Sequence, residues 1–178
     1  DGLLAASRPG VPVSWMDAWL GDWVVTPRQG KPVEINALWF ALLQQLGEEE
    51  EAARVREAFL RRYWSGALGY LLDVIDGPEG DDATFRPNQM LAVAVAPDLL
   101  PGDVARRVTE AVRERLLTPV GLRTLDPADP RYRGQYSGDV RARDEAYHQG
   151  TVWPWLLGAY ADAVLRLYPD GRDQAAAL

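Results

Sequence analysis

The chain has 178 residues, nearly half of them apolar, and a formal net charge of −7. This length and composition suit one globular core, or a large part of a bigger one, and they exclude a disordered chain. We expect no nucleic-acid partner, because phosphate binding needs a basic surface. We also expect no membrane partner, since the net charge disfavours an anionic surface and no apolar run is long enough to span a bilayer.

Cysteine is absent and histidine occurs once, as His148. These counts exclude a disulfide framework and leave no plausible zinc site, so we expect neither a metal nor another cofactor. Together with the lack of a signal peptide, the absence of cysteine favours a cytoplasmic location. The chain does not begin with methionine, which indicates a fragment of a longer protein.

Residues 1–32 are interrupted by glycine and proline, and a long helix is not expected there. Trp15, Trp19 and Trp23 are spaced four apart within this segment, and Asp17 lies among them. The indoles would share one face of a helix, where they would form either a core stripe or the apolar surroundings of an acidic catalytic group.

Apolar periodicity predicts an amphipathic helix over residues 33–46, ended by Gly47. The predicted core stripe consists of Ile35, Leu38, Leu42 and Leu46, widened by Trp39 and Leu43. Glu34 in the first turn is expected to complement the helix dipole. A second helix begins at residues 48–51. Its acidic residues come first and its basic residues last, an order typical of a solvated helix face.

Further along, residues 65–86 are predicted to be a loop region that contains one short apolar run. Residues 90–95 should form a helix buried nearly all round, and residues 104–116 another helix. The segment 121–143 is irregular, and a last helix is expected over residues 151–168.

The predicted fold class is therefore all-α, an array of α/α hairpins with about five or six helices. No segment alternates strongly enough between apolar and polar residues to predict a sheet. Long loops on a helical scaffold usually carry function, so the polar and aromatic loops are where a site is expected.

Residues 143–155 combine the single histidine with two tryptophans and two adjacent carboxylates, Asp144 and Glu145. Carboxylates accept hydrogen bonds from sugar hydroxyls or take part in proton transfer, and indoles stack on the C–H faces of sugars. An aromatic core segment with an ordinary helix cap is the alternative interpretation. Asp17 paired with Glu145 or Asp144 would suit acid and base catalysis at a glycosidic bond.

Five motifs follow one another across most of residues 12–160. They are SWMDA at 14–18, TPR with GKPVEINALW between 26 and 39, RPNQ at 86–89, GLRTL at 121–125 and YHQGTVWPW at 147–155. In this order they resemble the C-terminal amylo-α-1,6-glucosidase domain of the bacterial and archaeal glycogen debranching enzymes.

The resemblance implies that residues 1–178 are the C-terminal half of an (α/α)6 barrel, without the family's N-terminal domain and first barrel helices. It implies hydrolysis of α-1,6-linked glucose at branch points, with inversion and without a metal. The expected partner is an α-glucan such as glycogen or a limit dextrin. A homo-oligomer or a separate partner chain would supply the missing half of the barrel.

Carried over by motif, Asp17 is the expected general acid and Glu145 the candidate general base. Eukaryotic relatives resemble this chain near residues 148–150 but place a glutamate where it has Val152, so a subsite role for Glu145 stays open. The glucose subsite implied by the resemblance comprises Trp15, Arg28, Glu34, Asn36, Arg86, Asn88, Gln89, Arg123, Asp144, His148, Gln149, Trp153 and Trp155. Two alternatives stay open: a non-catalytic α-glucan-binding fragment, and a related inverting glycosidase of the trehalase type.

Overall fold

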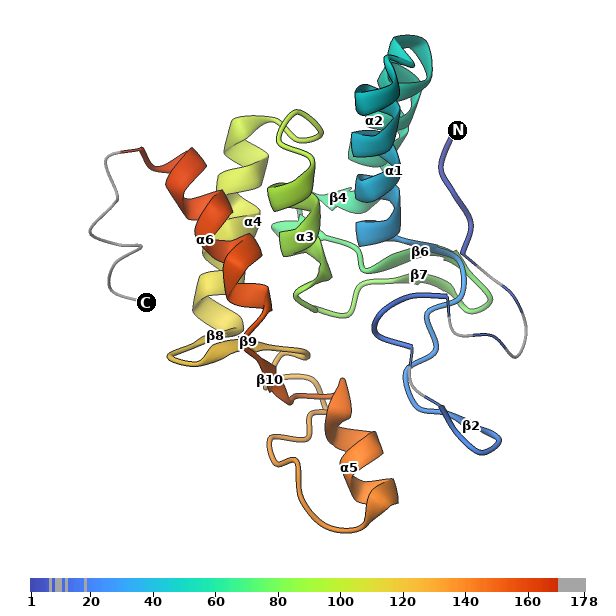
Figure 1. Cartoon of the computed structure of the whole chain (residues 1–178), viewed down its shortest axis with the longest axis vertical. Helices are drawn as coiled ribbons and strands as arrows, with labels where there is room; N and C mark the ends of the chain where they lie inside the picture. The colour runs from blue at the N-terminus through green and yellow to red at the C-terminus, as the bar shows by residue number, and fades with distance from the viewer. Residues whose placement is uncertain (7, 9–10, 12, 18, 170–178) are drawn as a thin grey trace.

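The computed structural model describes residues 1–6, 8, 11, 13–17 and 19–169, so Ala18 of the first motif lies outside the described residues. Within that part the chain forms six helices and ten short strands (Figure 1). The helices are α1 (Val33–Leu46), α2 (Glu49–Tyr63), α3 (Asn88–Val95), α4 (Gly102–Arg115), α5 (Val140–Tyr147) and α6 (Leu156–Leu167). The strands are β1 (Trp19–Leu20), β2 (Trp23–Val24), β3 (Lys31–Pro32), β4 (Trp64–Ser65), β5 (Tyr70–Leu71), β6 (Val74–Gly77), β7 (Gly80–Asp82), β8 (Leu117–Thr118), β9 (Gly121–Arg123) and β10 (Val152–Trp153).

The prediction of an all-α fold is wrong, because the strands pair into four antiparallel sheets and the fold is mixed α/β. Two sheets are hairpins, β1–β2 and β4–β5, and two have three strands, in the orders β3–β6–β7 and β10–β9–β8. The strands are too short to show a period of two in sequence, since they are two to four residues long. The (α/α)6 half-barrel implied by the resemblance therefore does not describe this structure.

Helix α3 lies at the centre of the helical layer, where it contacts α1, α4 and α6. Met90, Ala92 and Val93 are buried, whereas Leu91 and Ala94 are partly buried and Val95 is exposed, so this segment is less completely buried than predicted. The three-stranded sheets lie at one end of these helices, with β6 and β7 below α1 and the other sheet below α4 and α6 (Figure 1). No helix in the described part of the chain combines the length and apolar character that crossing a bilayer needs.

Helix α1 has the predicted bounds, and Gly47 ends it in the left-handed conformation with φ 74°. Its buried face differs from the predicted stripe. The buried apolar residues are Val33, Ala37, Phe40 and Leu43, whereas Leu38, Leu42 and Leu46 are exposed. Apolar residues occur on two faces of this helix, and the packing of α2 and α3 against it determines which face is buried.

Three other segments differ from expectation because they take part in sheets or in an unpredicted helix. Residues 65–86 contain β5, β6 and β7. The last helix begins at Leu156, since Val152 and Trp153 pair with β9 as β10. The segment 121–143, expected to be irregular, contains β9 and the start of α5.

Neighbouring leucines on α1 test this packing. Leu43 is 3% exposed and Leu42 is 48% exposed. We expect Leu43→Ala to lower the free energy of unfolding by about 2–5 kcal/mol, because it leaves a cavity in the core. Leu42→Ala should stay within about 0.5 kcal/mol of the wild type. Urea denaturation of both variants measures the difference, and equal losses would contradict the observed orientation of α1.

Candidate functional site

Four charged side chains, Arg28, Glu34, Asp73 and Arg86, are buried together and are named here the ionic centre; each is at most 3% exposed. Arg28 bridges the two carboxylates. Its Nε donates to Asp73 Oδ2 at 2.8 Å, and its Nη2 donates to Glu34 Oε2 at 2.8 Å and to Asp73 Oδ1 at 3.1 Å. Two positive and two negative groups balance, which reduces the cost of removing the charges from water.

The pairing of β3 with β6 brings the partners of the ionic centre together. Lys31 pairs with Ile75, so Arg28, just before β3, lies beside Asp73, just before β6. Gly30 permits this approach, because it has φ 129° and a Cβ there would lie 2.6 Å from the Ile75 carbonyl oxygen. The local backbone therefore fixes a contact between residues 45 positions apart.

Both arginines of the ionic centre are charged at neutral pH. Burial opposes the charge of Arg28, but Asp73 and Glu34 more than offset this effect and raise its pKa. Burial lowers the pKa of Arg86 to about 10, although the charge of Asp73 favours the protonated form. Arg86 therefore stays a donor over the pH range in which most enzymes work.

Arg86 connects the ionic centre to three segments far away in sequence. Its Nη1 donates to the carbonyl oxygens of Thr124 at 3.1 Å and His148 at 2.6 Å. Its Nη2 donates to Gln149 Oε1 at 2.8 Å. Its Nη1 also contacts Met16 Sδ at 3.6 Å, so four of the five motifs meet at this guanidinium.

A second set of hydrogen bonds joins the ionic centre to the segment 13–17, which carries the predicted acid. Asn88 Nδ2 donates to Asp73 Oδ1 at 2.7 Å, and Asn88 Oδ1 accepts from Trp15 Nε1 at 2.9 Å. Arg28 Nη1 donates to Ser14 Oγ at 3.1 Å. Trp15 and Ser14 therefore attach this segment to the ionic centre.

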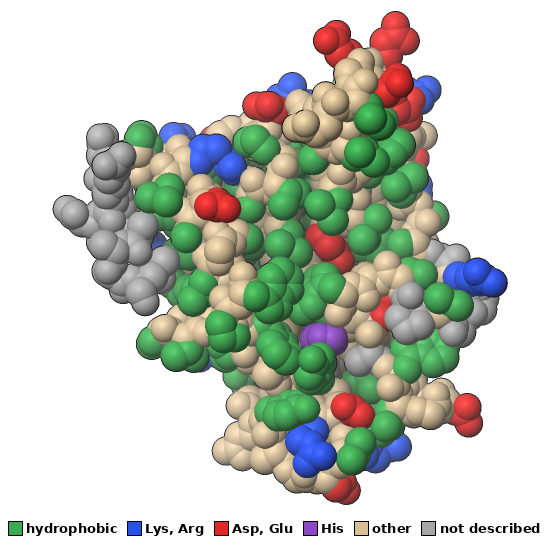
Figure 2. All heavy atoms as spheres, viewed as in Figure 1, with side chains coloured by type: hydrophobic (Ala, Val, Ile, Leu, Met, Phe, Trp, Pro, Cys, Tyr) green, Lys and Arg blue, Asp and Glu red, His purple; other side chains and the backbone are tan. Residues whose placement is uncertain are grey.

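Aromatic rings gather around the single histidine in an aromatic cluster of Trp15, Tyr147, His148, Trp153 and Trp155. The ring of Trp15 lies edge-on to His148 and to Trp155, with centroids 5.2 Å and 4.9 Å apart. Tyr147 lies 4.6 Å from His148 and 4.7 Å from Trp153. Figure 2 shows the histidine on one face of the molecule with hydrophobic side chains next to it. The structure thus brings together the tryptophans expected to stack on a sugar, and Trp155 is 50% exposed.

His148 is neutral at pH 7. Burial is the main reason that its pKa is lowered to about 4; a hydrogen bond with the Met16 backbone acts in the opposite direction, and the charges of Arg86 and Arg28 lower it further. Its Nδ1 is buried without a hydrogen-bond partner among the described residues. With the other ring nitrogen bonded to the Met16 backbone, Nδ1 of the neutral imidazole is the nitrogen left to accept a hydrogen bond.

Asp17 is half-buried beside this cluster. Its Oδ2 accepts hydrogen bonds from the backbone amides of Val13 at 2.6 Å and Ser14 at 2.8 Å. Within the described residues no hydrogen bond reaches Oδ1. The loop therefore holds one carboxyl oxygen in place, and the other has no hydrogen bond among the described residues.

Glu145 lies in α5, is half-exposed, and pairs with Arg133 at 3.3 Å. Arg141 and Arg143, which lie close to Glu145 in sequence, make other contacts. The Arg141 guanidinium lies 4.4 Å from the ring centroid of Trp23, and Arg143 donates to a backbone carbonyl. Helix α5 contacts β1, and both lie at the end of the molecule away from the α1–α2 turn (Figure 1).

Other predicted subsite residues use their polar groups within the protein. Asn36 hydrogen-bonds the backbone of Leu4 with both amide atoms. Gln89 likewise bonds to two backbone groups, and Arg123 donates weakly to a backbone carbonyl at 3.4 Å. Asp144 is half-exposed on α5 next to Glu145. Their role as glucose ligands stays a prediction.

Asp73 is the residue of this region that the sequence analysis missed. It is the single acidic residue in the apolar run 70–75, and it is 2% exposed. A lone carboxylate in such a run is a signal, because a buried charge requires a partner of opposite sign. Nothing local to the run identifies that partner.

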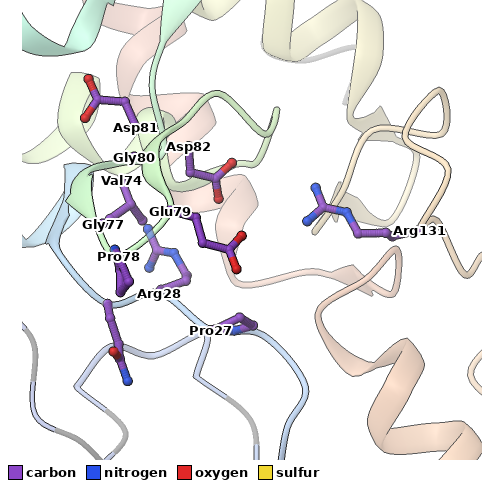
Figure 3. A pocket seen from close by; sticks show the side chains of 11 residues that line it. Pro27, Arg28, Val74, Gly77, Pro78, Glu79, Gly80, Asp81, Asp82 and Arg131 are labelled. Carbon is purple, nitrogen blue, oxygen red and sulfur yellow. The ribbon is translucent and has the colours of Figure 1, made fainter.

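A pocket of about 400 Å³ lies between the β6–β7 hairpin and Arg131, whose side chain points toward Asp82 and Glu79 (Figure 3). It is lined by Pro27, Arg28, Gln29, Val74, Gly77, Pro78, Glu79, Gly80, Asp81, Asp82 and Arg131. Arg28 is the one predicted subsite residue among them, and no aromatic side chain is present. Because Arg28 is already paired in the ionic centre, we place the candidate site at the aromatic cluster. Among the described residues, no group of three or more histidine, aspartate or glutamate side chains could hold a metal ion.

The whole chain, residues 1–178, matches a family model described as amylo-alpha-1,6-glucosidase. The glycogen debranching enzyme of Saccharomyces cerevisiae is similar to it, with 39% identity over 93 residues. That alignment covers 49% of this chain and 6% of the yeast protein, so the chain spans only a small part of this relative's length.

The lowered pKa of His148 predicts a pH dependence of stability. Between pH 6.5 and about 4 the unfolded chain binds more protons at this residue than the folded chain does. The free energy of unfolding should therefore fall as the pH drops through this window, by at most about 1.4 kcal/mol per pH unit from His148. This contribution is fully present above pH 6.5.

Urea denaturation of the wild type and His148→Gln at several pH values isolates the effect, because the carboxylates that titrate in the same window are common to both. The wild type should lose more stability than the variant as the pH falls. Parallel curves would show that His148 is protonated as easily in the folded chain as in the unfolded one.

Proposed function

Because the chain belongs to the amylo-alpha-1,6-glucosidase family, we propose that it forms part of a glycoside hydrolase acting on α-1,6-linked glucose in a branched α-glucan. The observation that supports this proposal most is the aromatic cluster around His148, with Asp17 in the adjoining loop. Indole faces, a neutral imidazole and a carboxyl group are the groups that bind a pyranose and transfer a proton to it.

In the proposed reaction, Asp17 donates a proton to the glycosidic oxygen as the bond to the anomeric carbon breaks. Glu145 takes a proton from the water that attacks that carbon from the opposite face. The products are free glucose of inverted configuration and the shortened glucan. Inversion requires the two carboxyl groups to lie roughly 6.5–9.5 Å apart, which leaves room for the water.

Two contacts support pairing these carboxyl groups. Helix α5, which carries Glu145, contacts β1, which begins two residues after Asp17. Trp15 contacts His148, three residues after Glu145. We assign direct sugar contacts to Trp15, His148 and Trp155, and assign to the ionic centre the task of holding them in place.

Removal of either carboxyl group tests the mechanism. We expect the chain to release glucose from a branched limit dextrin, and Asp17→Asn and Glu145→Gln to lower kcat by about 10²–10⁴-fold, the usual contribution of a general acid or base. Glu57→Gln is the control, since Glu57 is an exposed carboxylate on α2 paired with Arg61. NMR of the first glucose released determines whether the anomeric configuration inverts.

The choice of substrate separates the alternatives. Binding of the dextrin with no release of glucose would identify a glucan-binding chain without activity. Faster hydrolysis of trehalose than of the dextrin would identify a different glycosidase. Full activity in Glu145→Gln would assign the base to another residue, and Asp144, the carboxylate next to it in sequence, would be tested first.

The two tryptophans of the last motif should respond differently to substitution. Trp155 is 50% exposed, whereas Trp153 is partly buried against the core and donates from Nε1 to the Tyr147 carbonyl at 3.1 Å. We expect Trp155→Ala to weaken binding of a maltooligosaccharide by about 1 kcal/mol with little loss of stability. Trp153→Ala should mainly lower the free energy of unfolding. Calorimetric titration and urea denaturation measure the two effects, and an unchanged affinity in folded Trp155→Ala would exclude stacking on this indole.

A further inference from the structure

Asp73 accepts hydrogen bonds from two of the side chains that hold the candidate site, Arg28 and Asn88, and a third, Arg86, lies within ion-pair distance. Its carboxylate accepts from Arg28 Nε at 2.8 Å and from Asn88 Nδ2 at 2.7 Å, and Arg86 Nε lies 3.9 Å from Oδ2. At 2% exposure it is shielded from solvent, and it has no part in the proposed acid and base steps.

One arm of this network leads from Asp73 to the proposed acid. Arg28, fixed by Asp73, donates from Nη1 to Ser14 Oγ at 3.1 Å. The backbone amide of Ser14 in turn donates to Asp17 Oδ2 at 2.8 Å. Three hydrogen bonds thus separate the buried carboxylate from the proposed catalytic one.

A second arm sets the indole beside the acid. The amide of Asn88 has its nitrogen directed to Asp73, which leaves Oδ1 to accept from Trp15 Nε1 at 2.9 Å. The same Asn88 nitrogen lies 3.5 Å from Met16 Sδ. Without the bond to Asp73, only the weak sulfur acceptor of Met16 would orient the amide toward Trp15.

A third arm reaches the histidine turn. Arg86 lies next to Asp73 and donates to the carbonyl oxygen of His148 at 2.6 Å and to Gln149 Oε1 at 2.8 Å. The acid loop and the histidine turn are therefore both held by donors that surround one carboxylate.

We propose that Asp73 is the positioning residue of this site, which holds the Ser14–Asp17 loop and the His148 turn in one arrangement. Its effect on a reaction rests on the proposed function, whereas its effect on the loop does not. A carboxylate is required because both of its oxygens accept from cationic or amide donors at once, and because it balances the buried arginines.

A fluorescence measurement tests the positioning without any activity. The emission of Trp15 is obtained as the difference between each protein and the same protein with Trp15→Phe. We expect Asp73→Asn to change this difference spectrum, since the indole loses its fixed partner. Asp126→Asn is the matched control, because Asp126 is a buried carboxylate paired with Arg115, and among the described residues no hydrogen bond or ion pair joins its side chain to the Ser14–Asp17 loop. It should leave the Trp15 spectrum unchanged.

A kinetic measurement tests the consequence for catalysis. On a branched limit dextrin, Asp73→Asn should lower kcat by about 100-fold, the effect of displacing a catalytic group by about 1 Å. KM should change by less than about tenfold, and Asp126→Asn should keep the kcat of the wild type. Should the wild type release no glucose, the proposed function fails, and the Trp15 spectrum still decides the role of Asp73.

Two milder variants keep the test decisive if Asp73→Asn does not fold. Ser14→Ala removes the bond from Arg28 to the loop, and Asn88→Ala removes the bond to Trp15, while both leave the Arg28–Asp73 pair intact. We expect a smaller fall of kcat in each and an altered Trp15 spectrum in Asn88→Ala. A folded Asp73→Asn with the spectrum and kcat of the wild type overturns the proposal, as do wild-type properties in both milder variants.

Discussion

The buried pairing of Arg28 with Asp73 and Glu34 is the interaction on which the rest of the structure depends. Removing charged groups from water is costly, and the arrangement persists because each charge has a partner at hydrogen-bond distance. The partners come from the loop before β3, the first turn of α1 and the turn between β5 and β6. Any displacement of one of these elements would leave a buried charge unpaired, so the ionic centre fixes their relative positions.

The side chains of the candidate site form two sets, one buried and hydrogen-bonded within the protein and one with an exposed ring or an unpartnered atom. The ionic centre and Asn88 are buried and direct their hydrogen bonds to other protein groups. Trp155 is half-exposed, and His148 has a ring nitrogen without a partner among the described residues. Under the proposed function, the second set would need the rigid support of the first to keep a fixed geometry toward a sugar.

Small antiparallel sheets, absent from the predicted fold, position most of this site. Pairing of β3 with β6 brings Arg28 to Asp73, and pairing of β9 with β10 sets Val152 and Trp153 of the last motif beside the GLRTL segment. Such strands carry too few residues for alternation to be recognised, and their partners are far away in sequence. They are stabilised by backbone hydrogen bonds between distant segments, which a pattern of side chains does not reveal.

The sequence by itself determined the bounds of α1, because its apolar spacing and Gly47 are local signals that need no partner. It also predicted that Trp15 and His148 belong to one site, and the structure places their ring centroids 5.2 Å apart. Only the tertiary structure decided that Leu43 and not Leu42 faces the core, because apolar residues lie on two faces of α1 and the neighbouring helices bury one of them. The tertiary structure alone identified Asp73, because the role of a buried carboxylate depends on hydrogen-bond donors that the fold brings next to it from distant parts of the chain.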